Sequence, residues 1–416
     1  MTHLKTKITL ASAFAATAGL ALFSGEANAT DNNDWTMRQK GYYLTRAGDC
    51  GACHTVDENR PMAGDYALPT PFGTIYSANL TPDDETGLGR WSEDDFYRAM
   101  NEGISRDGSR LYPAFPYTHF TIVTREDSDA IFAYLNSLEP VRQEVREPEI
   151  PWPLNWRASM IGWNLLNFED RNFEPNPERS EEWNRGKYLV EGLAHCGMCH
   201  SPKNLIGAVK EGEHRFTGGF AEGWWAPSLT GSKRDGIGDW SKQELVEFLR
   251  YGRNDRTAAF GPMTDVIEKS TSHLTESDVS AIAEYIKSLP AHEETPVEPL
   301  REDQKPMVLG QRIYETQCSA CHAPEGEGVP RQFAPLKGSS LVHSHDPTTL
   351  VRAVLEGAKA VPTERYPTPQ AMPAFDWKLS DEEIAAVLTY VRNSFGNAAP
   401  AVSVDFVKDV RENTDR

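Results

Sequence analysis

The sequence has few basic residues for its length, and it has no long apolar run after its N-terminus. Its 416 residues contain 42 Lys and Arg against 61 Asp and Glu, a formal net charge of −19. A chain of that charge repels the phosphates of nucleic acid, so we expect no nucleic-acid partner. A membrane-spanning helix needs about 20 consecutive apolar residues. The sequence therefore argues against a multi-span transporter, and any contact with the inner membrane is expected to be peripheral.

The one apolar run predicts a secretory signal. Lys5 and Lys7 precede apolar residues 8–23, and Ala27-Asn28-Ala29 has the small-x-small pattern of a signal-peptidase site. We interpret residues 1–29 as a signal peptide and expect the rest of the chain in the periplasm. The alternative is an anchor helix that stays in place, which the short run disfavours.

Cysteine is also scarce, and all six cysteines lie in three copies of one motif. The copies are Cys50-Gly51-Ala52-Cys53-His54, Cys196-Gly197-Met198-Cys199-His200 and Cys318-Ser319-Ala320-Cys321-His322. C-x-x-C-H is the attachment signature of c-type haem: two thiols on one helical turn form thioethers with the haem, and the next His binds the iron. We predict three covalently bound haem c groups, with His54, His200 and His322 as axial ligands.

Other uses of these cysteines fit less well. Disulfides are common in exported chains, but three copies of C-x-x-C-H favour haem. A thioredoxin-like dithiol needs a βαβ context, and a zinc site needs four ligands gathered from paired knuckles.

The flanks of the motifs repeat as well. Each motif follows a helical pattern with a glycine and an aromatic residue, at Gly41-Tyr42, Gly186-Lys187-Tyr188 and Gly310 to Tyr314. Capping boxes at Ser92 and Ser241, and Asp346-Pro347-Thr348 in the third unit, predict a middle helix. The closing helices are predicted at 124–138 with Tyr134, 275–289 with Tyr285 and 380–395 with Tyr390. We expect the first and last helices of each unit to cross.

This order of elements resembles the class I cytochrome c domain. At roughly 150 residues per domain the length allows two to four domains. The predicted fold is all-α, with three tandem class I cytochrome c domains of a few helices around a covalently bound haem. We place the domains at 30–140, 180–290 and 306–396, with a Pro/Trp-rich linker at 141–179, a second linker at 291–305 and a tail at 397–416.

The Pro/Trp-rich linker contains Trp152, Trp156 and Trp163. It has two interpretations: a strap packed across neighbouring haem domains, or a surface that docks a partner subunit or the membrane interface.

A low-spin haem needs a second axial ligand, usually Met or His. One methionine stands in the loop before the closing helix in each of units two and three. These are Met263, in Gly261-Pro262-Met263-Thr264, and Met372, in Ala371-Met372-Pro373. We predict both as ligands, with His273 as a reserve for Met263.

The first unit departs from this pattern, because Phe115 stands where Met372 stands in the third. Phenylalanine cannot bind iron, and we predict His119 as the substitute. Met62, Met100 and a five-coordinate iron are the alternatives. A haem with two histidines is expected to have the lowest potential of the three. Iron-binding imidazoles usually donate their other nitrogen to a carbonyl, which we expect at Pro227, at Pro335 and within 78–80.

Three segments of the sequence resemble the triheme cytochrome c subunit of periplasmic membrane-bound dehydrogenases. They are Trp225-Ala226-Pro227-Ser228-Leu229, Phe260-Gly261-Pro262-Met263 and Met372-Pro373-Ala374-Phe375. In that family the subunit accompanies a quinoprotein alcohol dehydrogenase or a flavin-dependent gluconate, sorbitol or fructose dehydrogenase, and passes electrons to ubiquinone. The loop at 111–117, with Phe115, is similar instead to cytochromes paired with molybdenum-containing aldehyde or N-heterocycle dehydrogenases.

We therefore expect a periplasmic relay that carries electrons from a dehydrogenase catalytic subunit (quinoprotein, flavoprotein or molybdenum type) to ubiquinone or to a downstream cytochrome or oxidase. No nucleotide fingerprint, hydrolase elbow or metalloprotease motif occurs, so we expect no catalysis on this chain alone. Two alternatives stay open: a peroxidase-like haem enzyme with an open first iron, and a free electron shuttle.

Overall fold

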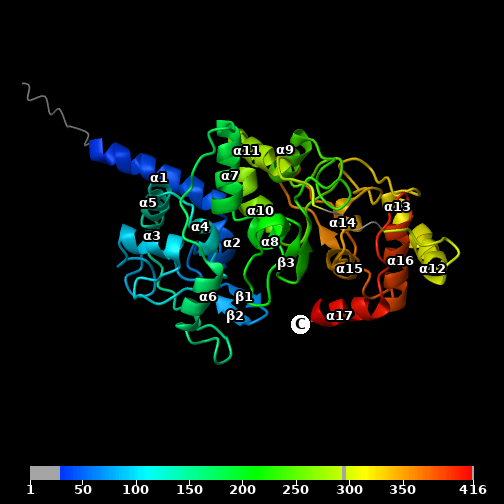
Figure 1. Cartoon of the computed structure of the whole chain (residues 1–416), viewed down its shortest axis with the longest axis horizontal. Helices are drawn as coiled ribbons and strands as arrows, with labels where there is room; N and C mark the ends of the chain where they lie inside the picture. The colour runs from blue at the N-terminus through cyan, green and yellow to red at the C-terminus, as the bar shows by residue number, and fades with distance from the viewer. Residues whose placement is uncertain (1–28, 293–296, 415–416) are drawn as a thin grey trace, which may run out of the picture.

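The computed structural model describes residues 29–292 and 297–414, so the predicted signal peptide lies outside the described residues apart from Ala29. The chain forms three mainly helical units that follow one another along the long axis of the molecule (Figure 1). The predicted fold class is confirmed. Among the described residues, none of the helices is long and apolar enough to cross a membrane.

The first unit consists of five helices and one hairpin, and the second repeats this plan. The first contains α1 (Ala29–Ala47), α2 (Cys50–His54), β1 (Ala67–Thr70), β2 (Gly73–Tyr76), α3 (Glu93–Glu102), α4 (Tyr117–Phe120) and α5 (Arg125–Leu135). The second contains α7 (Glu181–Tyr188), η1 (Leu189–Leu193), α8 (Gly197–His200), η2 (Gly212–His214), β3 (Gly219–Ala221), β4 (Trp224–Ala226), α9 (Lys242–Tyr251), α10 (Met263–Lys269), η3 (Thr271–His273) and α11 (Glu276–Lys287).

The third unit adds a C-terminal helix to the plan. Its elements are α12 (Lys305–Ile313), η4 (Tyr314–Cys318), α13 (Ser319–His322), α14 (Ser340–His343), α15 (Thr348–Glu356), β5 (Ala358–Lys359), β6 (Ala371–Met372), α16 (Asp381–Asn393) and α17 (Val404–Thr414). The sequence pattern indicates only a plain tail where α17 stands. This helix packs on α15 and α16, and Arg411 donates to Asp381 at 2.7 Å.

Capping explains where the helices begin. Ser92, Ser241 and Ser380 each form a full capping box at α3, α9 and α16, and Thr124 and Thr275 cap α5 and α11. Each cap satisfies an amide at a helix start that would otherwise lack a partner. These predicted helix starts are confirmed. The short antiparallel hairpin in each unit was not predicted.

The first and last helices of each unit cross, as predicted, and the first helix has a glycine at the crossing. A Cβ atom on Gly41, Gly186 or Gly310 would lie 1.8, 1.9 or 2.2 Å from a carbonyl oxygen of the closing helix. The Cβ atoms of Tyr134, Tyr285 and Tyr390 lie at the same three crossings. Only a residue without a side chain lets the two backbones approach this closely.

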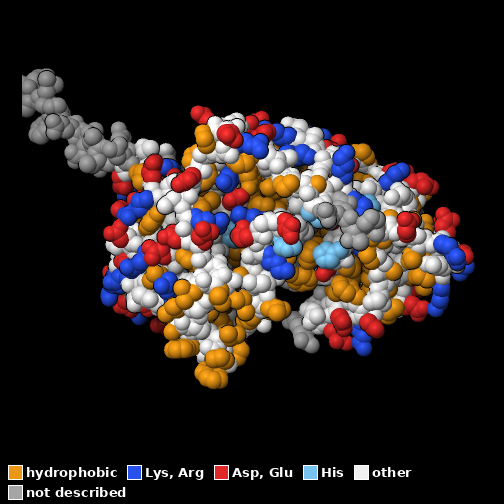
Figure 2. All heavy atoms as spheres, in the orientation of Figure 1, with side chains coloured by type: hydrophobic (Ala, Val, Ile, Leu, Met, Phe, Trp, Pro, Cys, Tyr) orange, Lys and Arg blue, Asp and Glu red, His pale blue; other side chains and the backbone are white. Residues whose placement is uncertain are grey.

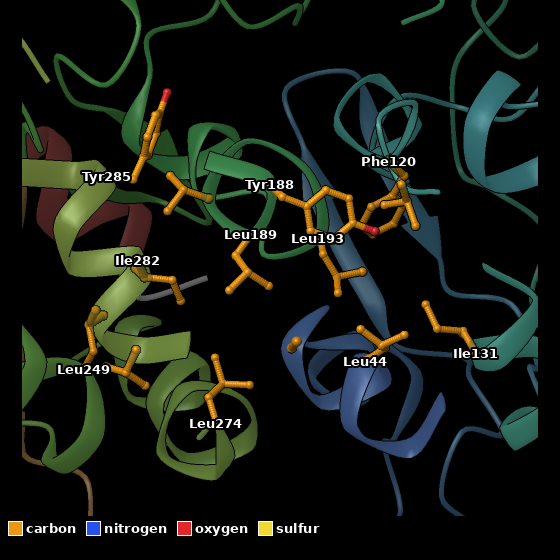
Figure 3. Close-up of a cluster of buried hydrophobic side chains, with 14 of the residues drawn as sticks. Leu44, Phe120, Ile131, Tyr188, Leu189, Leu193, Leu249, Leu274, Ile282 and Tyr285 are labelled. Carbon is orange, nitrogen blue, oxygen red and sulfur yellow. The ribbon is translucent and has the colours of Figure 1, made fainter. Parts of the chain in front are cut away.

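Units one and two share one hydrophobic core. Figure 3 shows Leu44 and Ile131 of the first unit in one cluster with Leu189 and Leu193 of the second. The buried residues of the third unit form a separate cluster around α15 and α16. The third unit docks on the second through hydrogen bonds, with Thr349 Oγ1 donating to the Trp225 carbonyl at 2.8 Å and Arg352 donating to the Gly223 carbonyl at 2.9 Å. A small apolar cluster also joins Val361 of the third unit to Ala259 and Ile267 of the second.

The Pro/Trp-rich linker is a strap packed across units one and two. Its helix α6 (Ser159–Asn167) is fixed to the first unit by Tyr117, whose hydroxyl donates to Asn164 Oδ1 at 2.6 Å. Trp163 Nε1 fixes it to the second unit by donating to the Ile206 carbonyl at 2.9 Å. The strap interpretation is therefore confirmed. The strap also carries exposed apolar side chains.

A buried acid ties units one and two together. Asp278 accepts from the Tyr43 hydroxyl at 2.6 Å and from two nitrogens of Arg185 at 2.8 Å each. Burial raises the pKa of Asp278, but the hydrogen bonds from Arg185 and Tyr43 outweigh it and leave the pKa below its usual value. The folded chain therefore favours the carboxylate.

We expect Tyr43→Phe to lower the free energy of unfolding by about 2 kcal/mol, because it removes a hydrogen bond to a charged acceptor and the acceptor of the Thr275 amide. The contribution of Asp278 is complete above the pKa of an unfolded aspartate and is lost as the pH falls through the lower folded pKa. The Tyr43→Phe deficit, measured by urea unfolding, should therefore shrink in acid. A deficit that stays constant below the folded pKa would contradict this account.

Three candidate haem sites

The two cysteines of each motif lie on one helical turn, and none of the six is in a disulfide. Burial raises the pKa of the Cys50 and Cys196 thiols to about 12 and that of Cys318 to about 11. A redox dithiol needs a lowered thiol pKa. The structure therefore argues against both disulfides and a thioredoxin-like function.

The three motif histidines share one geometry. His54 Nδ1 lies 2.7 Å from the Ala78 carbonyl, His200 Nδ1 lies 2.7 Å from the Pro227 carbonyl, and His322 Nδ1 lies 2.9 Å from the Ala334 carbonyl. This bond orients each ring and leaves Nε2 for a metal. The predicted acceptors in units one and two are confirmed. In unit three the prediction of Pro335 is wrong by one residue.

Burial lowers the pKa of His54, His200 and His322, with the carbonyl bond opposing this shift. Each ring is therefore neutral, which is the form that binds iron. Two thiols and an oriented neutral imidazole on one turn are the donor set that haem c requires. The residues present fit the group at all three motifs.

The two predicted methionine ligands lie at the edges of the cores. Met263 is the first residue of α10 and packs against the shared core of units one and two. Met372 lies in β6, pairs with Ala358, and packs against the core of the third unit. Both are partly buried and stand between the middle and closing helices, where the sequence places them.

In the first unit, Phe115 and the two alternative ligands Met100 and Met62 lie in different surroundings. Phe115 packs against Phe120, with 5.4 Å between ring centroids. Met100 is buried in α3 among the core residues of the first two units. Met62 lies beside the first motif. Its Cε atom is 3.9 Å from the point where a Cβ atom on Gly51 would stand.

His119 lies against the second unit. Its Nε2 is buried, has no hydrogen-bond partner in the structure and is 3.0 Å from the place of a Cβ on Gly197, inside the second motif. Burial lowers the pKa of His119 well below its usual value, and Arg215, His195, Arg171 and Lys203 add to this shift. These four residues belong to the strap and the second unit. His119 therefore lies at the boundary between the first two units, and its coordination of the first iron stays a prediction.

Units one and two contact each other reciprocally around their motifs. The helix α10, which begins at Met263, packs against α2, which carries the first motif. The helix α4, which carries His119, packs against η1, which leads into the second motif. The Cys199 thiol contributes to the raised pKa of Cys53, after burial and two acidic groups. This arrangement places the first two haem sites side by side, and no motif in the sequence indicates it.

Comparison with known proteins agrees with this structure. The family model described as cytochrome c matches residues 39–139, 184–290 and 307–395. The protein is therefore a chain of three cytochrome c domains, and its motifs carry three haem c groups.

The chain is 41% identical to the gluconate 2-dehydrogenase cytochrome c subunit of Pantoea cypripedii, with 92% of this chain and 91% of that protein aligned. It is 38% identical to the cytochrome c subunit of alcohol dehydrogenase (quinone) of Gluconacetobacter polyoxogenes, over 94% and 86% of the two chains. It is 42% identical to one of the nicotinate dehydrogenase subunits of Pseudomonas putida, over 88% of this chain but 31% of that longer protein. The chain belongs to the family of dehydrogenase cytochrome c subunits, and its function is electron transfer.

Proposed function

We propose that the chain accepts electrons from the catalytic subunit of a periplasmic dehydrogenase and delivers them to ubiquinone or to a downstream cytochrome of the respiratory chain. The observation that carries this proposal is the packing of three haem-binding units into one body, with the first two motifs adjacent. A relay needs closely spaced centres, and it needs no substrate chemistry on the chain itself.

We assign the residues as follows. The thiols of the three motifs hold haem c, and His54, His200 and His322 bind the iron through Nε2. Met263 and Met372 are the proposed sixth ligands of the second and third sites. When bound, haem iron supplies one-electron oxidation and reduction. The protein residues hold that iron in one coordination geometry and exclude water from it.

The donor is proposed to be a quinoprotein, flavoprotein or molybdenum-type catalytic subunit. The test uses the complex purified from its own host. Gluconate, ethanol, fructose and nicotinate are added one at a time, and one of these substrates should reduce all three haem centres. Ubiquinone added afterwards should reoxidise the three centres. Failure of the chain to purify with a dehydrogenase would favour a free shuttle instead.

Phe115 supports a second candidate function, an enzyme with an open iron in the first unit. The side chain at the expected ligand position cannot bind iron, and His119 lies against the second unit. Turnover of peroxide by the isolated holoprotein would support this candidate, whereas its absence would leave the relay as the function.

Met372→Leu should make the ferrous protein bind one additional equivalent of carbon monoxide, because the variant removes the sixth ligand of the third site. The measurement is a carbon monoxide titration followed by difference spectroscopy. Met160→Leu, a buried methionine on the strap helix, is the matched control and should bind no more than the wild type. Equal stoichiometry in the two variants would exclude Met372 as a ligand.

A further inference from the structure

A lysine is bonded to the haem-attaching turn of the second unit. Lys203 Nζ donates to the Met198 carbonyl at 2.7 Å and to the Phe220 carbonyl at 2.8 Å. Met198 stands between the two cysteines of the second motif, and Phe220 belongs to β3, which packs beside α8 (Figure 1). Lys203 therefore joins the motif to the hairpin and places its charge at the turn that attaches the second haem c.

This charge has no paired acid. Lys203 is partly buried, and burial lowers its pKa. A neighbouring carboxylate would oppose that shift, but in the part of the chain that the structure describes only the Cys199 thiol does so. The two carbonyl acceptors favour the ammonium form. An unpaired ammonium keeps its full electric field, and partial burial limits the screening of that field by water and salt.

The three units differ at this position. The residue three places after the motif histidine is Asp57 in the first unit, Lys203 in the second and Glu325 in the third. Asp57 pairs with Arg60 at 3.1 Å, and Glu325 is exposed. All three motifs share the C-x-x-C-H turn and the carbonyl bond to the histidine. The sign of the charge beside the turn therefore distinguishes the second centre from the other two.

The cysteine thiols report the sign of the field at the first two motifs. Burial raises the pKa of Cys199, and the largest effect of a charge there is that of Lys203, which lowers it. Burial also raises the pKa of Cys53, but there the largest effect of a charge is that of Asp49, which raises it further. Glu222 raises the pKa of both thiols and so does not distinguish the two motifs. The nearest strong field is therefore positive at Cys199 and negative at Cys53.

A fixed charge beside a haem shifts its redox equilibrium. Reduction adds one electron and removes one unit of positive charge, so a nearby cation favours the reduced form. Charges on the outer surface act less strongly, because both signs are interspersed there (Figure 2) and solvent screens them. We propose that Lys203 raises the reduction potential of the second haem centre.

The lysine acts through its field and is neither oxidised nor reduced. The electron that enters the second centre comes from its redox partner, and the site of the first haem lies alongside. A raised potential at the second centre makes transfer from the first to the second more favourable. The inference concerns the potential alone and holds for any electron donor or acceptor, so its failure would leave the proposed relay standing.

The experiment is a redox titration of the full-length holoprotein, followed at the α-band. Lys203→Met removes the charge and keeps the length of the side chain. We expect the redox equilibrium of one of the three centres to move toward the oxidised form about tenfold, the order expected for one charge at a partly buried site. For a one-electron couple this is a fall of about 59 mV. The other two centres should move less.

Three further variants separate charge from structure. Lys203→Arg keeps the charge and should titrate as the wild type does, whereas Lys203→Gln keeps a hydrogen-bond donor without the charge and should lower the potential as Lys203→Met does. Lys233→Met is the matched control, because this lysine of the second unit has a side chain that is 80% exposed, and no centre should shift.

Urea unfolding of each variant measures the structural contribution of the lysine. A lysine with a structural role alone would lower the stability of Lys203→Met without moving any potential, and that result would overturn the proposal. So would a potential in Lys203→Gln equal to that of the wild type, because the hydrogen bonds and not the charge would then be responsible. If Lys203→Met does not fold, the comparison of Lys203→Gln with Lys203→Arg decides.

Discussion

The double variant Cys318→Ala/Cys321→Ala is expected to lack the mass of one haem and to lose a third of the α-band absorbance. Thioether attachment needs the two thiols, and the third motif is the one whose removal disturbs the rest least. Its unit has a hydrophobic cluster separate from that of units one and two. The first two centres should therefore stay attached and redox-active, while electron delivery through the third stops. Mass spectrometry and the reduced spectrum measure both effects.

Ser319→Ala is the matched control for this variant. Ser319 lies between the two cysteines, and its exposed hydroxyl donates to the Glu315 carbonyl at 2.8 Å. We expect full haem content in Ser319→Ala. Three attached groups in the double cysteine variant would show that attachment does not depend on the third motif.

Gly186→Ala is expected to be strongly destabilising, although it adds only one methyl group at a helix crossing. The new Cβ would lie 1.9 Å from the Ala281 carbonyl oxygen and 2.6 Å from its carbon, and both atoms belong to the backbone. The helices α7 and α11 must move apart inside the shared core, at a cost of about 3 kcal/mol. The measurement is the free energy of unfolding from a guanidinium titration.

Gly162→Ala provides the opposite expectation with the same chemical change. A Cβ on Gly162, in α6, meets no atom within 4 Å. Because alanine favours a helix over glycine, this variant should gain about 0.5–1 kcal/mol or stay neutral. If the two variants unfolded alike, close approach of the helices at Gly186 would not be what requires glycine there.

Much of this structure could be predicted because its determinants are local in the sequence. A C-x-x-C-H turn and a Ser-x-x-acid capping box each act over one helical turn, and the glycine and the tyrosine of each helix crossing recur at the same places in all three units. They located the haem motifs, the helix starts and the helix crossings. The hairpins are only two to four residues per strand, too short for an alternating pattern to show.

The contacts between units could not be predicted in this way. The position of His119 before a closing helix gives its place along the chain, but it does not say which neighbouring unit the imidazole faces. Contact with Gly197 depends on how α4 packs against η1, which is tertiary packing between two similar units.

The common hydrophobic cluster of the first two units also bears on how the chain divides. Three repeats are written in the sequence, yet the first two depend on one another, because neither would keep its apolar side chains from water if the other were removed. The third unit has an interior of its own, and its removal would expose only the small apolar contact of Val361 with Ala259 and Ile267.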